Sequence, residues 1–162
     1  MNKSIRQIRE TITRDDALRI VNSIARTGTS HIKSKIYYPY YWFTANCETR
    51  TLFGKKQFPA NCLVDACNGL GATADPFEVE ETTAASDAIL ATQTNPDVAR
   101  KSAHRFLSHN LSRATKMIGN FNIALDSRDV IYKTYWLIKC EGTLVMVDAT
   151  TGNLHKLNAK AA

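Results

Sequence analysis

The sequence contains few residues that break regular structure and no long apolar stretch. Seven glycines and four prolines among 162 residues exclude a collagen-like or low-complexity chain. No apolar run approaches the roughly 20 residues needed to cross a bilayer, so we predict no membrane-spanning segment. The first ten residues are charged and lack the apolar core of about 7–15 residues that defines a secretory signal. The expected location is therefore cytoplasmic.

Positive charge is missing from the middle of the chain. Residues 61–93 hold 6 Asp/Glu and no Lys/Arg, whereas residues 1–60 hold 11 Lys/Arg against 4 Asp/Glu and residues 94–162 hold 10 against 5. The net charge of +6 favours anionic partners in general. However, the basic residues are dispersed, and Lys55 and Lys56 form the only adjacent lysine pair. Nucleic acid is therefore a less favoured partner than a peptide or protein.

Two segments have the start signals and the periodicity of amphipathic helices. Thr13, with Asp16 three residues later, is typical of a helix start and predicts a helix that ends at Gly28. Asn95 before Pro96 predicts a second helix, over residues 95–119. Isoleucines at helical spacing also predict a short leading helix over residues 4–12. The side chains expected to cover the sheets are Leu18, Val21 and Ile24 on the first helix and Phe106, Leu107 and Leu111 on the second.

The strand-like segments form an internal repeat. Residues 36–43 resemble residues 131–138, and both Leu63–Gly69 and Met146–Gly152 contain Val-Asp-Ala-x-x-Gly. Each half therefore reads as a helix, a strand, a hairpin turn, a second strand and an Asp-Ala-x-x-Gly turn. We predict an α+β fold of two similar helix-plus-antiparallel-hairpin halves, with the helices packed on one face of the sheets. The halves are residues 1–72 and 94–162, and residues 73–93 form an acidic connector.

The second half resembles a PepSY-type domain. In such domains a helix packs on a hairpin that ends in a Val-Asp-x-x-Thr-Gly turn, and here the segment Tyr135–Gly152 reads YWLIKCEGTLVMVDATTG. The resemblance covers residues 96–157 well and residues 13–71 loosely. It implies a tandem, non-enzymatic protein, since PepSY-type proteins commonly bind peptides or restrain peptidases and are often exported.

The first hairpin carries aromatic residues where the second carries lysines. Alternation along the strand places Tyr37, Tyr41 and Phe43 on the core face, so Tyr38, Tyr40 and Trp42 fall on the outer face. Such an aromatic face is either covered, by the other half-sheet or by a second copy in a homodimer, or used to bind a ligand or peptide. The candidate binding residues are Tyr38, Tyr40, Trp42, Lys33, Lys35 and Asp65.

Partner binding at this hairpin could also use a strand edge. Pro39 predicts an edge strand, because proline has no N–H to donate within a sheet. A peptide could then add to the edge through backbone hydrogen bonds, with the aromatic side chains selecting it. Lys33 and Lys35 would favour an acidic partner.

The register of the first hairpin has two readings. A Gly54-Lys55 turn would place Cys47 opposite Cys62, within reach of a disulfide. The internal repeat instead places Tyr40 opposite Asp65. In a cytoplasmic chain, buried free thiols are the expected state.

No catalytic or cofactor signature is present. Cys62 and Cys67 have four residues between them and no nearby histidine, so we expect no metal site. The histidines are scattered at positions 31, 104, 109 and 155 and accompany no nucleophile motif, so no catalytic residue and no cofactor can be named.

The sequence therefore favours a non-enzymatic binding or regulatory protein that recognises a peptide or protein segment through the aromatic hairpin face. One alternative is a single-stranded nucleic-acid binder, which would stack bases on the aromatic residues and place Lys55 and Lys56 on phosphates. The other is an accessory protein or an enzyme of unrecognised type.

Overall fold

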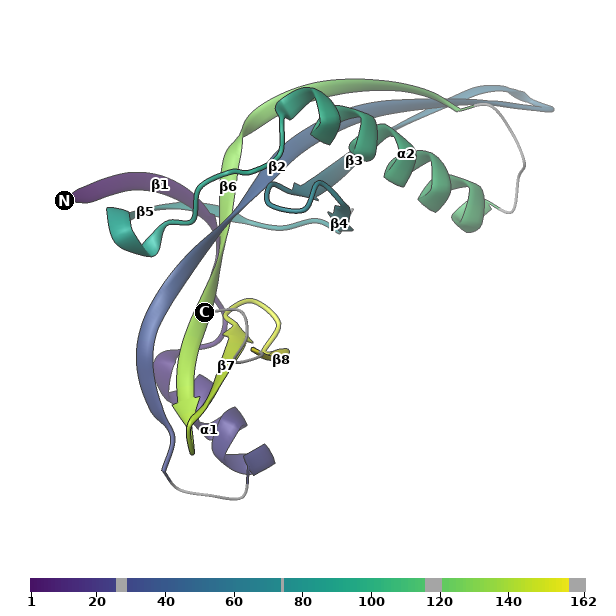
Figure 1. Cartoon of the computed structure of the whole chain (residues 1–162). Helices are drawn as coiled ribbons and strands as arrows, with labels where there is room; N and C mark the ends of the chain where they lie inside the picture. The colour runs from purple at the N-terminus through teal and green to yellow at the C-terminus, as the bar shows by residue number, and fades with distance from the viewer. Residues whose placement is uncertain (26–28, 74, 116–120, 158–162) are drawn as a thin grey trace. The chain divides into compact units, whose positions relative to one another are not determined.

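Strands dominate the fold. The computed structural model describes residues 1–25, 29–73, 75–115 and 121–157, with 54% strand and 23% helix. Its strands form one mixed sheet in the order β4-β3-β2-β6-β1-β5, with β7 paired to β6 and β8 to β7 (Figure 1). The elements are β1 (Asn2–Ile8), α1 (Arg14–Ala25), β2 (His31–Thr51), β3 (Gly54–Asp65), β4 (Gly71–Thr73), β5 (Val79–Ala85), the 3-10 helix η1 (Ser86–Ala88), α2 (Pro96–Thr115), β6 (Asn122–Cys140), β7 (Thr143–Asp148) and β8 (Leu154–Lys156).

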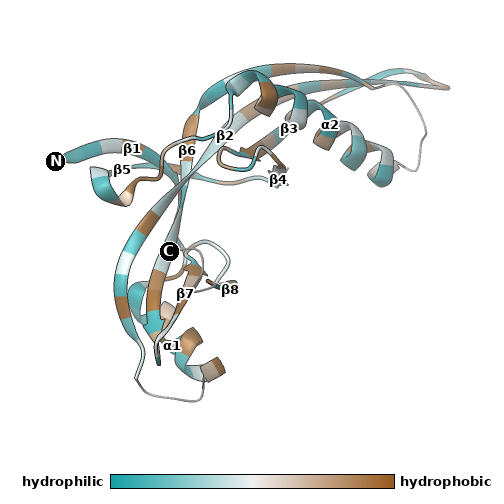
Figure 2. Cartoon of the chain, in the orientation of Figure 1, coloured by the Kyte–Doolittle hydropathy of each residue, from teal (hydrophilic) through white to brown (hydrophobic). Residues whose placement is uncertain are grey.

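The predicted fold class, two α+β halves with helices packed on one face of the sheets, is wrong. A single mixed sheet of eight strands, with two α-helices in the described part of the chain, replaces the two helix-covered hairpins. The physical reason lies in β2 and β6, which run for 21 and 19 residues. Each strand extends well beyond the hairpin that the sequence predicts, and bands of polar and apolar residues continue along both (Figure 2).

The chain divides into two compact units that do not follow chain order. The first comprises Met1–Tyr38, Phe77–Leu90 and Tyr132–Ala162, and the second comprises Pro39–Pro76 and Ala91–Ile131. These boundaries differ from the expected halves, 1–72 and 94–162. Each long strand belongs to one unit over part of its length and to the other unit over the rest.

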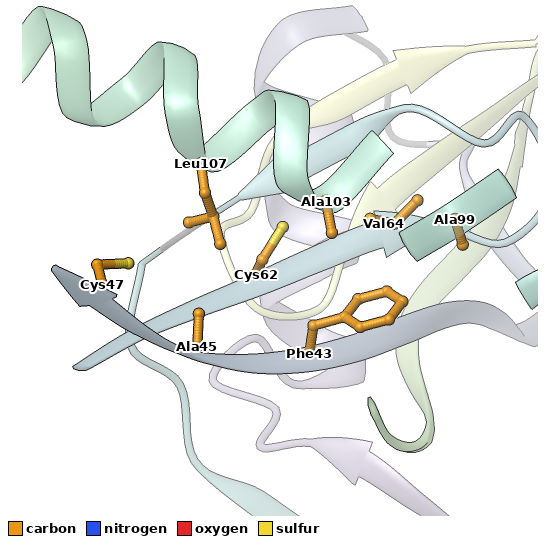
Figure 3. Packing of buried hydrophobic residues seen from close by; sticks show 8 residues of the cluster. All are labelled: Phe43, Ala45, Cys47, Cys62, Val64, Ala99, Ala103 and Leu107. Atoms are coloured by element: carbon orange, nitrogen blue, oxygen red, sulfur yellow. The ribbon is translucent and has the colours of Figure 1, made fainter. Parts of the chain in front are cut away.

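In the second unit, α2 packs on the β2–β3 hairpin. Leu107 and Ala103 point from the helix toward Phe43 and Cys62 on the strands (Figure 3). The predicted helix start is correct, since the Asn95 side chain accepts a hydrogen bond from the Asp97 N–H at 2.7 Å. Phe106 and Leu111 lie against the same core and are partly buried. Residues 116–119 of the predicted helix lie outside the described residues.

In the first unit, α1 packs on the β6–β7 hairpin. Ala17 and Val21 are buried with Ile138, Val145 and Val147. The Thr13 hydroxyl accepts from the Asp16 N–H, and the Asp16 carboxylate accepts from the Thr13 N–H, both at 3.2 Å, so the capping box is present. Residues 26–28 of the predicted helix lie outside the described residues.

The buried face of α1 is narrower than the apolar stripe that its sequence predicts. Leu18 packs against the core as expected. Ile24, which we expected to be in the core, is instead 65% exposed. The apolar stripe of the helix is therefore wider than the surface that it covers.

The leading segment and the acidic connector are strands that pair with each other. The helix expected over residues 4–12 is wrong, because β1 runs antiparallel to β5, with Asn2 opposite Ala85 and Ile8 opposite Val79. Burial of Ile5 and Ala84 explains the pairing, since alternate residues of both strands face a small apolar cluster. The acidic connector, residues 73–93, therefore contains a strand and is not a continuous linker.

The two Asp-Ala-x-x-Gly turns have the same geometry. Tyr40 lies opposite Asp65, as the repeat predicts, and Tyr135 lies opposite Asp148. The glycine of each turn donates its N–H to the aspartate carbonyl at 2.8 Å. Both glycines have positive φ, +77° at Gly69 and +78° at Gly152, which explains the residue type.

The alternative register of the first hairpin is wrong. The strands meet at Thr51 and Gly54, so Leu52 and Phe53 form the tip. Cys62 consequently faces Phe43, and Cys47 faces Phe58. All four cysteines are free thiols.

Candidate functional site

The predicted aromatic face is largely covered. Tyr40 is only 7% exposed. Trp42 is half-buried and donates its indole N–H to the Asn61 side-chain oxygen at 3.3 Å. In the first unit, the Tyr38 ring meets the Tyr135 ring edge-on, with centroids 6.1 Å apart. A continuous exposed patch is therefore not formed, and a binding role for these aromatic residues stays a prediction.

The two candidate lysines have different surroundings. Lys33 is exposed. Lys35 forms an ion pair with Glu10, and its Nζ lies 4.9 Å from the centroid of the Trp136 ring and 5.5 Å from that of Tyr37. The charge of Lys35 is thus already paired with a carboxylate and two aromatic faces within its own unit. It therefore offers little to an acidic partner.

The candidate Asp65 organises its own turn. Its carboxylate accepts hydrogen bonds from the backbone N–H groups of Cys67 at 2.8 Å and Asn68 at 3.0 Å. Asp148 accepts in the same way from Thr150 and Thr151. The shared pattern indicates that the Asp-Ala-x-x-Gly motif has a structural role in both repeats.

Asp148 also forms a part-buried ion pair. Burial by itself would raise the pKa of its carboxyl, but the Lys133 ammonium at 2.8 Å and the turn N–H groups outweigh it and hold the pKa below its usual value. The charged form of Asp148 is therefore the one that the fold stabilises.

The β2 strand is not an edge strand, so the expectation based on Pro39 is wrong. In the sheet order, β2 lies between β3 and β6. Its pairing with β3 begins at Tyr40, directly after the proline, and the Pro39 carbonyl accepts from the Ala66 N–H at 3.1 Å. Proline is tolerated because it lies just outside the β3 ladder. Peptide addition at this strand is accordingly not supported.

A groove in the first unit has the properties that the aromatic face lacks. Its volume is about 340 Å³, and it lies between α1 and the surface formed by β7 and β8. Apolar side chains line most of it, and one acidic and one basic residue stand at the β6–β7 turn and on β8. The lining includes Val21, Ile24, Val145, Leu154, Glu141 and Lys156.

The groove lies beside a short strand with one neighbour. In the part of the chain that the structure describes, β8 pairs with β7 alone, through Leu154 opposite Val147 and Lys156 opposite Val145. Leu154 and Lys156 alternate along β8 and both line the groove. The strand therefore combines a backbone edge with side chains directed to an apolar hollow.

Sequence reasoning missed this groove for an identifiable reason. Ile24 belongs to an unbroken apolar helical series, and nothing in that series marks its last member as exposed. The internal repeat is the signal that could have revealed β8, because a short strand follows each of the two equivalent aspartate turns. Neither of these strands, β4 or β8, was predicted.

The remaining reactive groups to place are the metal-ligating side chains and the cysteine thiols. No group of three His, Cys, Asp or Glu residues in the described ranges could hold a metal ion. Burial raises the pKa of the Cys62 thiol to about 12 and also raises that of Cys47. These thiols are therefore poor nucleophiles and act as small core residues.

The comparisons with known proteins do not assign a family. No family model, no curated protein and no solved structure gives a significant match to the chain. The resemblance to PepSY-type domains stays a prediction. Among the described residues, neither α-helix has the length and apolar content needed to span a bilayer.

Proposed function

We propose that this protein is a non-enzymatic binding protein that recognises an extended peptide or protein segment. The observation that carries the proposal is the apolar groove of about 340 Å³ beside the edge of β8. Ile24, 65% exposed at the rim, gives a partner apolar surface to bury. The site lies in the first unit and replaces the first hairpin as the proposed location of binding.

The occupant that fits is a segment in β conformation with alternating apolar side chains. Such a segment would pair its backbone with the edge of β8 and place every second side chain in the groove. Glu141 and Lys156 carry opposite charges at the rim and give no net preference for an acidic partner. Backbone pairing would therefore supply much of the affinity, and the groove would select side chains by size.

We further propose a cytoplasmic location. Four free thiols support it, because Cys47 and Cys62 are fully buried without forming a disulfide. The compartment would also give the exposed β8 edge access to unfolded or flexible protein segments.

Panning of a random heptapeptide phage library against the purified protein tests the proposed function. We expect enrichment of peptides with apolar residues at alternate positions. Ile24→Asp should weaken the binding of synthetic copies of those peptides by about tenfold or more, because it places a charge in the groove. Copies methylated on alternate backbone nitrogens should also lose binding, because they cannot pair with β8.

Val98→Asp is the matched control, since Val98 is an exposed β-branched residue on the other helix and does not line the groove. Circular dichroism should show both variants folded, and Val98→Asp should bind as the wild type does. Failure to enrich any peptide family, or equal binding by Ile24→Asp, would contradict the proposal.

A further inference from the structure

The tip of the β2–β3 hairpin presents two apolar side chains to solvent. Leu52 is 99% exposed and Phe53 is 100% exposed, the highest values after the N-terminal methionine among the large apolar residues that the structure describes. They occupy the turn between the paired residues Thr51 and Gly54. The tip lies at the far end of its unit, past α2 in the view of Figure 1, and is hydrophobic in Figure 2. A pair of this kind is an expected interaction site, because exposed apolar side chains gain free energy on leaving water.

Positive charge surrounds the base of this tip. Arg50 lies directly opposite Lys55, and Lys56 lies one pair farther back, opposite Thr49. Glu48 forms an ion pair with Lys55 at 3.3 Å and is the one acidic residue among residues 48–57, which leaves this end of the hairpin with a net charge of +2. Like charges directly opposite each other destabilise a sheet, and the Glu48–Lys55 ion pair offsets part of the repulsion between Arg50 and Lys55.

We propose that the β2–β3 tip binds the surface of an anionic lipid membrane, with Leu52 and Phe53 inserted and the cations on the headgroups. The strand rise of about 3.4 Å places the cations roughly 7–10 Å behind the tip. That separation matches the depth of about 5–10 Å at which interfacial apolar groups lie below the headgroups. The proposal concerns peripheral attachment and is independent of the groove in the first unit.

A membrane fits these residues better than a protein pocket for two reasons. The apolar pair stands at the apex of a hairpin with cations on both strands, an arrangement that suits a flat anionic plane approached end-on. The site also holds both parts of an interfacial anchor, an apolar wedge and a basic collar, and neither part alone gives stable attachment. A surface pocket of about 310 Å³, lined by Arg50, Lys55, Glu48 and Asn122, lies beside the collar and could hold a headgroup phosphate.

Co-sedimentation of the full chain with two kinds of vesicle tests the proposal. One kind contains phosphatidylcholine alone, and the other contains equal parts of phosphatidylcholine and phosphatidylserine. We expect the protein to pellet with the anionic vesicles and not with the neutral ones, and the bound fraction to fall with added salt. Leu52→Ser combined with Phe53→Ser should reduce partitioning by about tenfold or more, and Arg50→Glu combined with Lys56→Glu should abolish it.

Leu70→Ser is the matched control, because Leu70 is an exposed leucine in another turn of the same unit. It should leave partitioning unchanged, and circular dichroism should show every variant folded, since the altered side chains lie in solvent. Phe53→Trp should add a blue-shifted emission component with anionic vesicles only. No pelleting by the wild type, equal pelleting with neutral vesicles, unchanged partitioning of the Leu52/Phe53 variant, or self-association through the tip in the absence of lipid would each overturn the proposal. Binding of free inorganic phosphate without vesicle binding would also overturn it.

Discussion

Asp65 and Asp148 each hold a turn together by accepting two backbone hydrogen bonds, and Asp148 also accepts from the Lys133 ammonium at 2.8 Å. The two repeats differ at the position of this lysine, since the residue equivalent to Lys133 in the first half is Tyr38. The Lys133–Asp148 ion pair therefore has no sequence equivalent in the first half. A titration can separate the two aspartates.

Replacing Asp148 by asparagine should lower the free energy of unfolding by about 3 kcal/mol at neutral pH, because it leaves the Lys133 ammonium without its carboxylate. The folded-state pKa of Asp148 is depressed, so its stabilisation is complete above the unfolded value near 3.8 and is lost as the pH falls through the lower folded-state value. Urea unfolding of both proteins from neutral pH down to about pH 2 should therefore show the difference closing.

Asp65→Asn is the matched comparison, because it alters the equivalent turn at a position where tyrosine replaces the lysine. The pH dependence of each loss of stability shows how much the charge of each aspartate contributes to its turn. A loss for Asp148→Asn that does not change with pH would show that the turn hydrogen bonds, and not the ion pair, account for its effect.

At the scale of the elements, α2 and β4 approach each other so closely that the contact requires a glycine. In the second unit, a Cβ added at Gly71 of β4 would lie 2.4–2.7 Å from atoms of Phe106 on α2, closer than carbon atoms pack. One of those atoms is the Phe106 Cβ, which cannot move away by rotation of the ring. The glycine is therefore needed for space.

Gly71→Ala should destabilise the protein by about 1–3 kcal/mol, because the new methyl group overpacks the contact between β4 and α2. Phe106→Ala removes the obstructing ring at a cost of its own. The double variant should be more stable than the sum of the two single effects predicts, and thermal unfolding of all four proteins measures that coupling. Additive effects would mean that α2 and β4 do not touch at this point.

At the scale of the whole molecule, each helix packs on the hairpin of the other repeat. The helix α1 precedes the β2–β3 hairpin in sequence but packs on β6–β7, and α2 precedes β6–β7 but packs on β2–β3. The long strands make this exchange possible, because β2 and β6 each contribute residues to both units. Neither repeat therefore contains a complete core.

Fragments 1–76 and 77–162 should each fail to fold alone and should recover native structure when mixed, since both units draw on both fragments. Circular dichroism and amide NMR spectra of the separate and mixed fragments measure this. The mixture should give one dispersed spectrum that matches the intact chain. A folded fragment 1–76, with α1 on its own hairpin, would show that the exchange between repeats is not required for folding.

Several features could be predicted from local signals without tertiary information. The capping residues Thr13 and Asn95 located the two helix starts, and the repeat gave the correct register of Tyr40 opposite Asp65. These features depend on neighbouring residues or on a motif present twice, so short-range physics is enough to determine them.

The partners of those elements were decided only by the tertiary structure. Strand periodicity is the same whether a strand turns back on its own helix or continues into another core, so the lengths of β2 and β6 could not be read from the pattern. Exposure follows from packing in the same way, which is why Ile24 is exposed against expectation and why only the structure could show that Tyr40 is buried. The sequence by itself determined the helix starts and the turns, and it narrowed the register of the first hairpin to two readings, between which the structure decided. The pairing of β1 with β5, the exchange of helices between repeats and the groove beside β8 arose only when residues distant in the chain competed for the same apolar surface.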